Sequence, residues 1–214
     1  MTAAGLPLGA VAQHEFMVCG PSLALRYPGP RDASALFALA RDPGVTRFFS
    51  WGPYRDEREA RTWLATLPAR RARGIALELA VVDTADVAIG ITLLSELHRR
   101  DRRAVVGTWL GRCHWGTGAN RETKALITHL AFGLLGLERV GAYADVRNTR
   151  SRKALERIGF TCEGVLHEFH RHDGIPRDVA LYALLRRQWR LGKLAQLPVR
   201  ISGTPPAAFA VSRP

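Results

Sequence analysis

The sequence predicts a mixed α/β fold, in which antiparallel strands come first and parallel β-α-β units follow. Residues 76–82 and 87–97 are typical of two strands, joined by the hairpin turn Asp83-Thr84-Ala85-Asp86. Residues 104–110 form a third strand pattern, followed by a glycine turn and the helical pattern 119–135. A strand pattern at 139–146 comes next. A strand, a helix and a strand in succession require parallel pairing, so the second half is expected to contain β-α-β crossovers.

The other elements are expected in chain order around this centre, without an internal repeat. We expect a strand at 23–27, a helix with Asp32 as its N-cap, and a helix at 57–69 capped by Asp56. Ala60, Trp63, Leu64 and Leu67 share one face of that second helix. A short helix at 148–158 and a hairpin of strands 160–169 and 178–185 follow. The sheet should therefore have about seven strands, flanked by four helices.

The division into segments follows composition. Residues 1–21 are expected to be a flexible leader, and residues 22–190 a single domain. Residues 191–214 are rich in Gly, Pro, Ala and Ser without periodicity, which indicates a tail or a partner-binding arm.

The composition indicates a globular protein with a substantial core. The chain has 214 residues, of which 47% are apolar and 23% charged. No apolar run is long enough to span a bilayer, and the first residues lack the basic start of a secretion signal. The three cysteines are widely spaced, which argues against a disulfide framework and a zinc site. We therefore expect a cytoplasmic protein with no membrane partner and no metal.

The net charge of +12 is the strongest deviation in composition. Three residues, Lys124, Lys153 and Lys193, are lysines, and the other 28 of the 31 basic residues are arginines. Such a field attracts coenzyme A, acidic peptides and RNA alike, so charge alone does not select a partner. No double-stranded-RNA-binding, zinc-finger or RNP pattern is present. Proximity to RNA or to the ribosome stays open on this ground.

The glycine turn before the long helix is a candidate anion site. Gly116 and Gly118 let the backbone turn sharply, and the helix start adds free N–H groups and the positive end of the helix dipole. Thr117-Gly118 stands where a P-loop needs Lys-Ser/Thr, and the dinucleotide pattern G-x-G-x-x-G is absent. Taken alone, the turn is equally compatible with a helix start that binds nothing.

Residues 22–190 resemble the GNAT superfamily of N-acetyltransferases, and within it the RimJ/RimL-type acetyltransferases of ribosomal-protein N-termini. The segments that carry the resemblance are Leu23-Ala24-Leu25-Arg26, Asp32-Ala33-Ser34-Ala35-Leu36-Phe37, Asp42-Pro43-Gly44-Val45-Thr46-Arg47-Phe48, Gly107-Thr108-Trp109-Leu110, Cys113-His114-Trp115-Gly116-Thr117-Gly118, Asn148 to Phe160 followed by Glu163-Gly164, and Asp173-Gly174 with Asp178, Tyr182, Leu184 and Trp189. Cys113 replaces the usual first residue of the family's Q/R-x-x-G-x-G/A loop.

The resemblance implies a GNAT fold whose central strand splays from its neighbour, and acetyl-CoA as the donor. Backbone groups of Gly107–Leu110 would pair with the pantetheine arm, and amides from His114 to Asn120 would hold the pyrophosphate. The residues implied in cofactor binding are Trp109, Leu110, His114, Trp115, Gly116, Thr117, Gly118, Ala119, Asn120, Asn148, Ser151 and Lys153. Arg152 is a further cation that could reach the phosphates. Asn148 is also compatible with a plain N-cap.

The chemistry implied is direct attack of an amine on a thioester, which needs a base, a polarised carbonyl and a proton for the leaving thiolate. An amide of the central strand around Thr108–Leu110 would polarise the carbonyl. Leu155 stands where many relatives have the acidic tyrosine, so Ser151 is the nearest group to the sulfur. The candidate bases are His170 and, through a water, Glu96. Strand alternation would put Glu168 and His170 on one face, and His167 and Phe169 on the other.

The acceptor is expected to be a primary amine, with the α-amine at a protein or peptide N-terminus as the leading choice. An α-amine has a pKa of about 7.7–8.0, against about 10.4 for lysine, so it needs less help from a base. Phe49, Trp51 and Tyr54 could form the acceptor wall, although core packing is the commoner use of such residues. Val105 replaces a glutamate that relatives often have, which weakens transfer of peptide specificity.

Several alternatives stay open from the sequence. The acceptor could be a small amine such as an antibiotic or a polyamine, and the acyl group could differ from acetyl. A non-catalytic module that senses coenzyme A or binds RNA or the ribosome would also use the arginine surface and the segment 191–214. A metal held by His167, His170 and His172 lacks a fourth ligand. The protein could be a monomer or a homodimer.

Overall fold

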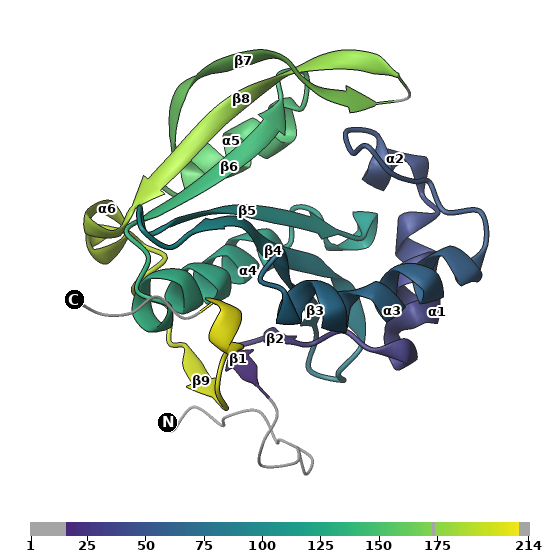
Figure 1. The fold of residues 1–214 in the computed structure, drawn as a ribbon, viewed down its shortest axis with the longest axis horizontal. Coiled ribbons are helices and arrows are strands. Elements are labelled where there is room, and N and C mark those ends of the chain that lie inside the picture. Colours follow the sequence, from purple (N-terminus) through teal and green to yellow (C-terminus); the bar gives the residue numbers. More distant parts are fainter. Residues whose placement is uncertain (1–15, 173, 210–214) are drawn as a thin grey trace.

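A single nine-stranded mixed sheet organises the part of the chain that the structure describes. The structure is a computed structural model and describes residues 16–172 and 174–209. The strands are β1 (Met17–Cys19), β2 (Ala24–Arg26), β3 (Ala76–Val82), β4 (Ala88–His98), β5 (Arg103–Leu110), β6 (Arg139–Asp145), β7 (Thr161–His172), β8 (Ile175–Leu185) and β9 (Arg200–Ser202). Their order across the sheet is β7-β8-β6-β5-β4-β3-β2-β1-β9 (Figure 1).

All neighbouring strands pair antiparallel except β5 and β6, which are parallel. The helices are α1 (Ala33–Ala40), α2 (Pro43–Thr46), α3 (Glu57–Ala72), α4 (Ala119–Thr128), α5 (Thr149–Arg157) and α6 (Arg186–Leu191), with a π-helical segment His129–Leu134 directly after α4. Within the described residues, none of them is both long enough and apolar enough to cross a membrane. The predicted order of elements, an antiparallel meander followed by a β-α-β crossover, is confirmed.

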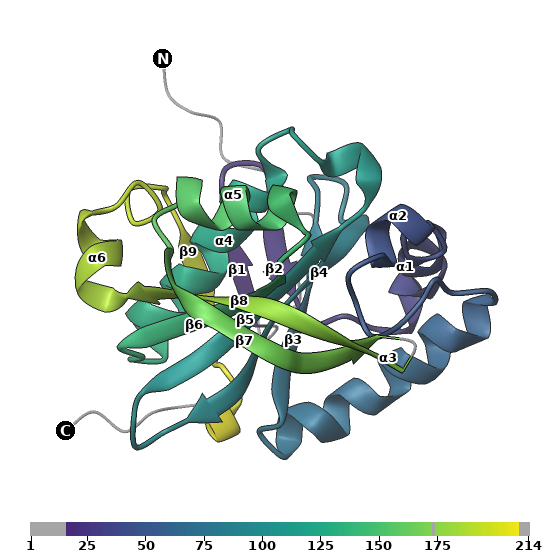
Figure 2. The same cartoon turned by 90° about the horizontal axis from the view of Figure 1, so that it is seen from above.

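Helices cover the two faces of the sheet separately. Leu36 of α1 and Leu64 and Leu67 of α3 pack against one face, together with Ile91 of β4. α4 and α5 cover the other face (Figure 2). Their apolar side chains form a larger core there. Because side chains alternate along a strand, β5 presents Val106, Thr108 and Leu110 toward α4, and Val105, Gly107 and Trp109 toward α1 and α3.

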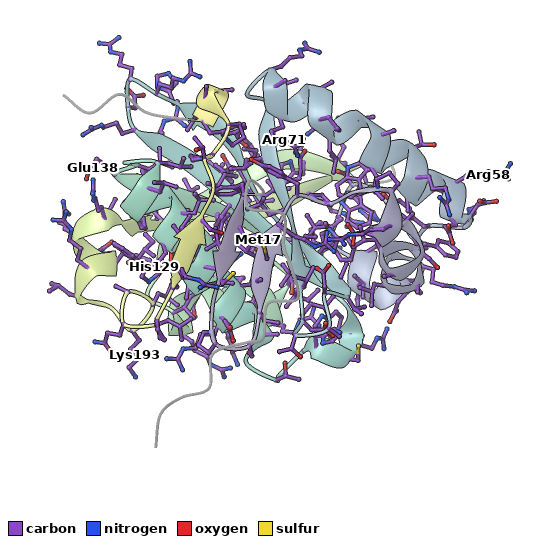
Figure 3. All side chains as sticks on the ribbon, turned by 90° about the horizontal axis from the view of Figure 1, so that it is seen from below. Met17, Arg58, Arg71, His129, Glu138 and Lys193 are labelled. Atoms are coloured by element: carbon purple, nitrogen blue, oxygen red, sulfur yellow. The ribbon has the colours of Figure 1, made fainter. Side chains whose placement is uncertain are left out.

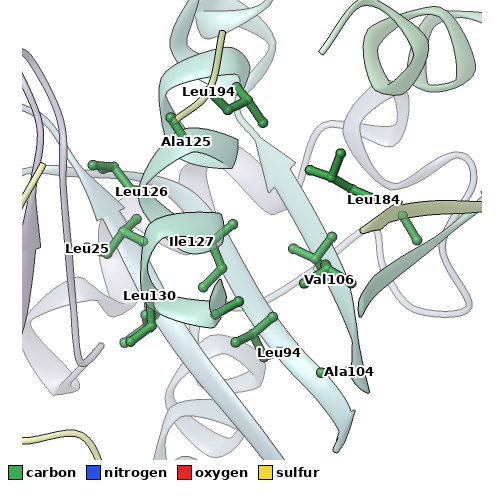
Figure 4. Packing of buried hydrophobic residues seen from close by; sticks show 14 of the residues in the cluster. Leu25, Leu94, Ala104, Val106, Ala125, Leu126, Ile127, Leu130, Leu184 and Leu194 are labelled. Atoms are coloured by element: carbon green, nitrogen blue, oxygen red, sulfur yellow. The ribbon is translucent and has the colours of Figure 1, made fainter. Parts of the chain in front are cut away.

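Helix α4 is amphipathic as its sequence pattern predicted. Leu126, Ile127 and Leu130 are fully buried and pack over Leu94 and Val106 of the sheet (Figure 4). The helical region ends at Leu134 as expected, but its last six residues take the wider π-helical form.

One predicted helix cap is confirmed and the other is wrong. The Asp56 carboxylate accepts from Arg58 N–H at the start of α3, and Glu59 completes a capping box. Asp32 precedes α1 but does not cap it. Its carboxylate is buried and pairs instead with both terminal nitrogens of Arg26, at 2.8 and 2.9 Å. A buried guanidinium attracts that carboxylate more strongly than a neutral N–H does.

Strands β1 and β9 lie in the segments 1–21 and 191–214, for which we expected no strands. β9 pairs antiparallel with β1, Val18 opposite Ile201 (Figure 3). Leu194 and Phe209 on either side of β9 are 3% and 0% exposed. Both strands lie in stretches rich in Gly, Pro and Ala that lack an alternating run, and they raise the strand count above the expected seven. The segment boundaries at residues 21 and 190 stay a prediction, and residues 1–15 lie outside the described part of the chain.

Candidate active site

The central strands β5 and β6 separate soon after they meet. Their parallel pairing joins Arg103–Val105 to Arg139–Gly141, and β5 then continues to Leu110 beside β4 alone (Figure 1). Gly107 O accepts from Thr92 Oγ1, and Gly111 N–H donates to Ile89 O, so these residues direct their backbone groups to β4. Backbone groups alternate in direction along a strand. Those of Val106, Thr108 and Leu110 therefore face the open side that β6 has left.

The glycine turn lies at the end of this opened strand. Gly116 and Gly118 have φ of +78° and +95°, a region that only glycine occupies without strain, and Gly118 is the N-cap of α4. Thr117 Oγ1 donates to His114 O and accepts from Ala119 N–H, which fixes the turn. The helix start thus presents N–H groups with no side chain covering Gly116 or Gly118.

A cavity of about 510 Å³ opens beside this turn. Its lining includes His114, Thr117, Gly118 and Ala119, all of which the sequence assigned to phosphate binding. Two cations, Arg121 and Lys193, line it as well, the second from the chain segment after α6. Two carboxylates, Asp83 and Glu122, line it too, so the feature that suits an anion is the set of helix-start amides.

The start of α5 faces the same side of the sheet. Asn148 Oδ1 accepts from Ser151 N–H at 3.1 Å, so Asn148 is the N-cap that the sequence allowed. Lys153 is exposed and Ser151 half-buried. Arg152, which we expected to reach toward phosphates, turns inward instead: its guanidinium donates to Val146 O and to Tyr182 Oη. The Val146 carbonyl is an acceptor near the start of the helix, and it draws the guanidinium in.

Arg150 connects α5 with the glycine turn. Its Cζ lies 3.2 Å from the centroid of the Trp115 ring, a close cation–π contact, and Trp115 Nε1 donates to Leu110 O. Partial burial and the nearby charge of Arg112 lower the pKa of Arg150. Arg112 is itself held by Asp42, with two hydrogen bonds of 2.7 Å. Two guanidinium groups therefore stand at the mouth of the strand opening.

An aromatic cluster lies on the opposite face of β5. Trp51 is its centre, with ring centroids 5.3 Å from Phe49, 5.5 Å from Tyr54 and 5.5 Å from Trp109. All four side chains are half-buried rather than sealed in the core. The indole of Trp109 therefore belongs to this cluster, whereas its predicted cofactor role concerned the strand backbone. The loop 48–54 and β5 together form an aromatic wall beside the opening.

A second cluster faces this side from β4, β6 and β7. Tyr143 on β6 donates its hydroxyl to Glu96 Oε2 at 3.2 Å, and its ring lies 5.0 Å from Phe169 and 5.8 Å from His170. Glu96 adopts φ of +51° at an irregularity of the β4–β5 pairing, close to the point where β5 and β6 separate. Strained backbone of this kind at a polar cluster is a common mark of function.

The structure brings Glu96 and His170 together, but not by the alternation we expected. A bulge between Leu166 and His170, with Glu168 at φ of +51°, shifts the register. Phe169 therefore contacts Tyr143 together with His170. His167 lies apart, its Nδ1 2.9 Å from Asp178 Oδ2. Tyr143 was missed from the sequence because it stands in an ordinary strand pattern, and only the pairing with Glu96 singles it out.

Comparison with known proteins assigns the family. A model of the acetyltransferase (GNAT) domain matches residues 22–161. The chain belongs to the GNAT acetyltransferases. It is 30% identical over 168 residues to the uncharacterized N-acetyltransferase p20 of Bacillus licheniformis, covering 78% of this chain and 94% of that protein. A GCN5-related N-acetyltransferase from Brucella melitensis has the same fold, with a TM-score of 0.75, 23% identity, and coverage of 87% of this chain and 84% of that one.

One relative carries a name that concerns its substrate. A "putative ribosomal N-acetyltransferase", YdaF of Bacillus subtilis (strain 168), is 37% identical over 101 residues, which are 47% of this chain and 55% of that protein. Members of the GNAT family use acetyl-CoA as donor. The glycine turn and the cluster of aromatic and polar groups thus lie on opposite faces of β5.

This acetyltransferase also buries a lysine at the centre of its site. Lys124 on α4 is 5% exposed, and its Nζ donates to Thr108 Oγ1 at 2.5 Å. Burial alone lowers its pKa from 10.5 to about 7, since no charged group contributes. The groups that face it from β4 and β5 are the hydroxyls of Thr92 and Thr108, which lie 2.8 Å apart.

The buried lysine predicts a pH dependence of stability. Its pKa is lower in the folded than in the unfolded chain, so the unfolded chain binds more protons between pH 7 and 10.5, and the free energy of unfolding rises with pH. We expect a gain of about 2 kcal/mol from pH 7 to 9, measured by chemical denaturation. Lys124→Met should remove the gain, and Lys193→Met, at an exposed position, should keep it. Equal slopes in the wild type and Lys124→Met would contradict the prediction.

Among the described residues, no group of three or more His, Cys, Asp or Glu is placed to hold a metal ion. His167 and His170 point to different partners, as described above.

Proposed function

We propose that this protein transfers an acetyl group from acetyl-CoA to the α-amine at the N-terminus of a protein or peptide. The observation that carries the proposal is the separation of β5 from β6, because it leaves strand backbone open between the glycine turn on one side and the cluster of Glu96, Tyr143, Phe169 and His170 on the other. Amides of the turn, with Arg121 and Lys193, suit the phosphates of acetyl-CoA. The freed groups of Val106 and Thr108 suit the amides of its pantetheine arm, beside Leu110, whose carbonyl accepts from Trp115 Nε1.

The acceptor amine would enter from the face of the aromatic wall. Glu96, held by the Tyr143 hydroxyl, takes the proton of the incoming ammonium, directly or through a water. The amine nitrogen then bonds to the acetyl carbon while the carbon–sulfur bond breaks, and the proton that the nitrogen gives up on becoming an amide passes to the leaving thiolate. The Thr108 N–H stabilises the charge that develops on the carbonyl oxygen. His170 borders the same space, and Ser151, on the other face, is the hydroxyl proposed to lie nearest the sulfur.

An α-amine fits these residues better than a lysine side chain does. A carboxylate takes a proton more readily from an amine of low pKa than from an amine of high pKa. An α-amine, with a pKa of about 7.7–8.0, is partly deprotonated at neutral pH and needs no stronger base. The similarity to YdaF points the same way for about half of the chain. A RimJ/RimL-like assignment, a cytoplasmic location and proximity to the ribosome belong to the same proposal.

An acceptor screen tests the proposal directly. The purified protein and acetyl-CoA are mixed with three acceptors: a peptide with a free N-terminus, the same peptide blocked at its N-terminus but carrying a lysine, and spermidine. We expect thiol release and one added acetyl group on the α-amine of the free peptide only. Turnover confined to spermidine would move the acceptor to a small amine. Binding of acetyl-CoA without turnover on any acceptor would favour the non-catalytic module.

The glycine turn gives a prediction for donor binding. An alanine at Gly118 is strained by about 1–2 kcal/mol at φ of +95°, so the turn is expected to relax away from the shape that presents its amides. We expect Gly118→Ala to weaken coenzyme A binding about tenfold in calorimetry. Gly133→Ala is the matched control, since Gly133 has equal space around it but lies in the helical segment after α4. An unchanged Kd for Gly118→Ala would argue against the turn as the phosphate site.

A further inference from the structure

Lys124 has no part in the chemistry proposed so far, although it lies against the strand that would receive the thioester. Its neighbour Thr108 is on the part of β5 that β6 has left. Within the described residues, Lys124 forms no ion pair, and Thr108 Oγ1 is its hydrogen-bond partner. Burying an amine with a single partner costs stability. A buried lysine that lowers stability in this way is expected to serve the function of the site.

The hydrogen bonds around Lys124 form a chain with a fixed direction. Thr92 Oγ1 donates its one proton to Gly107 O at 3.1 Å. Thr92 must therefore accept in its 2.8 Å contact with Thr108, and Thr108 gives up its own proton there. Thr108 Oγ1 can then only accept from Lys124 Nζ. The order of donors is Lys124, Thr108, Thr92, and the last acceptor is the carbonyl of Gly107.

The carbonyl at the end of this chain belongs to the peptide unit between Gly107 and Thr108. In a trans peptide, the C=O and N–H point to opposite sides. Gly107 O is directed toward β4, so Thr108 N–H is directed to the open side between β5 and β6. Hydrogen bonds that follow one another in a chain polarise each other, and a donor on the carbonyl strengthens the N–H of the same unit.

We propose that Lys124 is a positioning residue for acetyl transfer, which acts through Thr108 and Thr92 to orient and polarise the Gly107–Thr108 peptide, so that Thr108 N–H binds the thioester oxygen more strongly as charge develops on it. The inference rests on the proposed function for the place of the thioester. The new element is the group that polarises the Gly107–Thr108 peptide, namely the buried amine of Lys124 on α4. An apolar residue at position 124 would leave Thr108 Oγ1 without its donor and the chain free to reverse.

The test measures a property of bound acetyl-CoA, so it does not require the acceptor amine to be known. Acetyl-CoA labelled with carbon-13 in its thioester carbonyl is bound to the full-length wild type, to Lys124→Met and to Thr92→Val, and the carbonyl stretch is recorded by infrared difference spectroscopy. We expect the stretch to lie at higher frequency in both variants, since a weaker hydrogen bond leaves a stronger C=O bond. The double variant should shift it no further, because both changes break one chain.

Kinetics separate this role from a purely structural one. With whichever amine the wild type acetylates, kcat should fall about tenfold in both variants, the loss typical of one hydrogen bond, while Kd for acetyl-CoA stays within about twofold. Thr128→Val is the matched control. It removes another buried hydroxyl of α4, whose partners are Lys124 O and Ala125 O, and should leave stretch and kcat unchanged.

The outcomes distinguish the inference from the function on which it rests. An unshifted carbonyl stretch in folded Thr92→Val or Lys124→Met would overturn the role of Lys124, whatever the acceptor. Failure of the wild type to acetylate any peptide would overturn the proposed acceptor and leave the spectroscopic result standing. Failure of the wild type to bind acetyl-CoA would overturn both.

Discussion

Replacing Glu96 by glutamine is expected to lower kcat by about 10²- to 10⁴-fold, the range for loss of a general base. Glutamine keeps the size of the side chain, and its carbonyl oxygen can still accept from the Tyr143 hydroxyl, which lies 3.2 Å from Glu96 Oε2. What it cannot do is take a proton from the amine. The fold and the binding of acetyl-CoA should therefore survive while turnover falls. Steady-state kinetics and calorimetry with acetyl-CoA measure the two separately.

Three further variants test the assignment to Glu96. Glu138→Gln removes a carboxylate that pairs with Arg186 away from the site, and kcat should not change. Tyr143→Phe should reduce kcat by less than Glu96→Gln does, because it frees the carboxylate without removing it. If His170→Asn abolished turnover while Glu96→Gln kept it, the base would be the histidine, which borders the same ring of Tyr143.

Replacing Arg26 by leucine is expected to destabilise the fold by about 3–5 kcal/mol, the cost of breaking a buried ion pair at one end. Arg26 and Asp32 are each 3% exposed and joined by two hydrogen bonds, and Asp86 accepts a third from Arg26. Burial of Asp32 opposes its ionisation, but hydrogen bonds from Arg26 and Gly29 outweigh it and lower the pKa of Asp32. Without Arg26, that carboxylate would be buried and unpaired. Chemical denaturation at pH 7 measures the loss.

Matched variants separate this effect from the loss of one charge. Arg58→Leu removes an arginine that is 86% exposed and pairs with Asp56, and it should cost no more than about 1 kcal/mol. Arg26→Leu combined with Asp32→Leu should recover part of the stability, since no buried charge is left alone. A cost for Arg26→Leu as small as that of Arg58→Leu would show that solvent compensates the buried pair.

Much of the fold could be predicted because its elements are long and regular. The two strand patterns at 76–82 and 87–97, joined by a turn, and the helical spacing of Leu126 and Leu130 identified β3, β4 and α4 to within a few residues. The two terminal strands were missed because the stretches around them are rich in Gly, Pro and Ala and lack an alternating run such as the one at 23–27 from which β2 was predicted. Asp32 was misassigned as a cap because a cap is predicted from the neighbouring residues in the sequence. Its partner, Arg26, lies on another element, and its charge attracts the carboxylate more strongly than the N–H groups of the helix start do.

The residues of the candidate site were likewise predictable only in part. Gly116 and Gly118 could be predicted because a positive φ favours glycine, so this backbone conformation is visible in the sequence. Tyr143 and Lys124 could not be found. Their significance comes from Glu96 on β4 and Thr108 on β5, which the folded sheet brings next to them. The bulge at Glu168 likewise has no sequence signal, and it decides that Phe169 joins His170 beside Tyr143.

The pairing of β9 with β1 makes residue 190 a poor place to truncate the chain. Cutting there would remove β9, which pairs with the outer edge of β1. It would also remove Leu194 and Phe209, which are buried in the core. An unpaired strand edge beside newly exposed apolar surface promotes self-association. A fragment limited to residues 1–190, which keeps β1 and lacks β9, should thus aggregate where the full chain stays dispersed, a difference that light scattering would reveal.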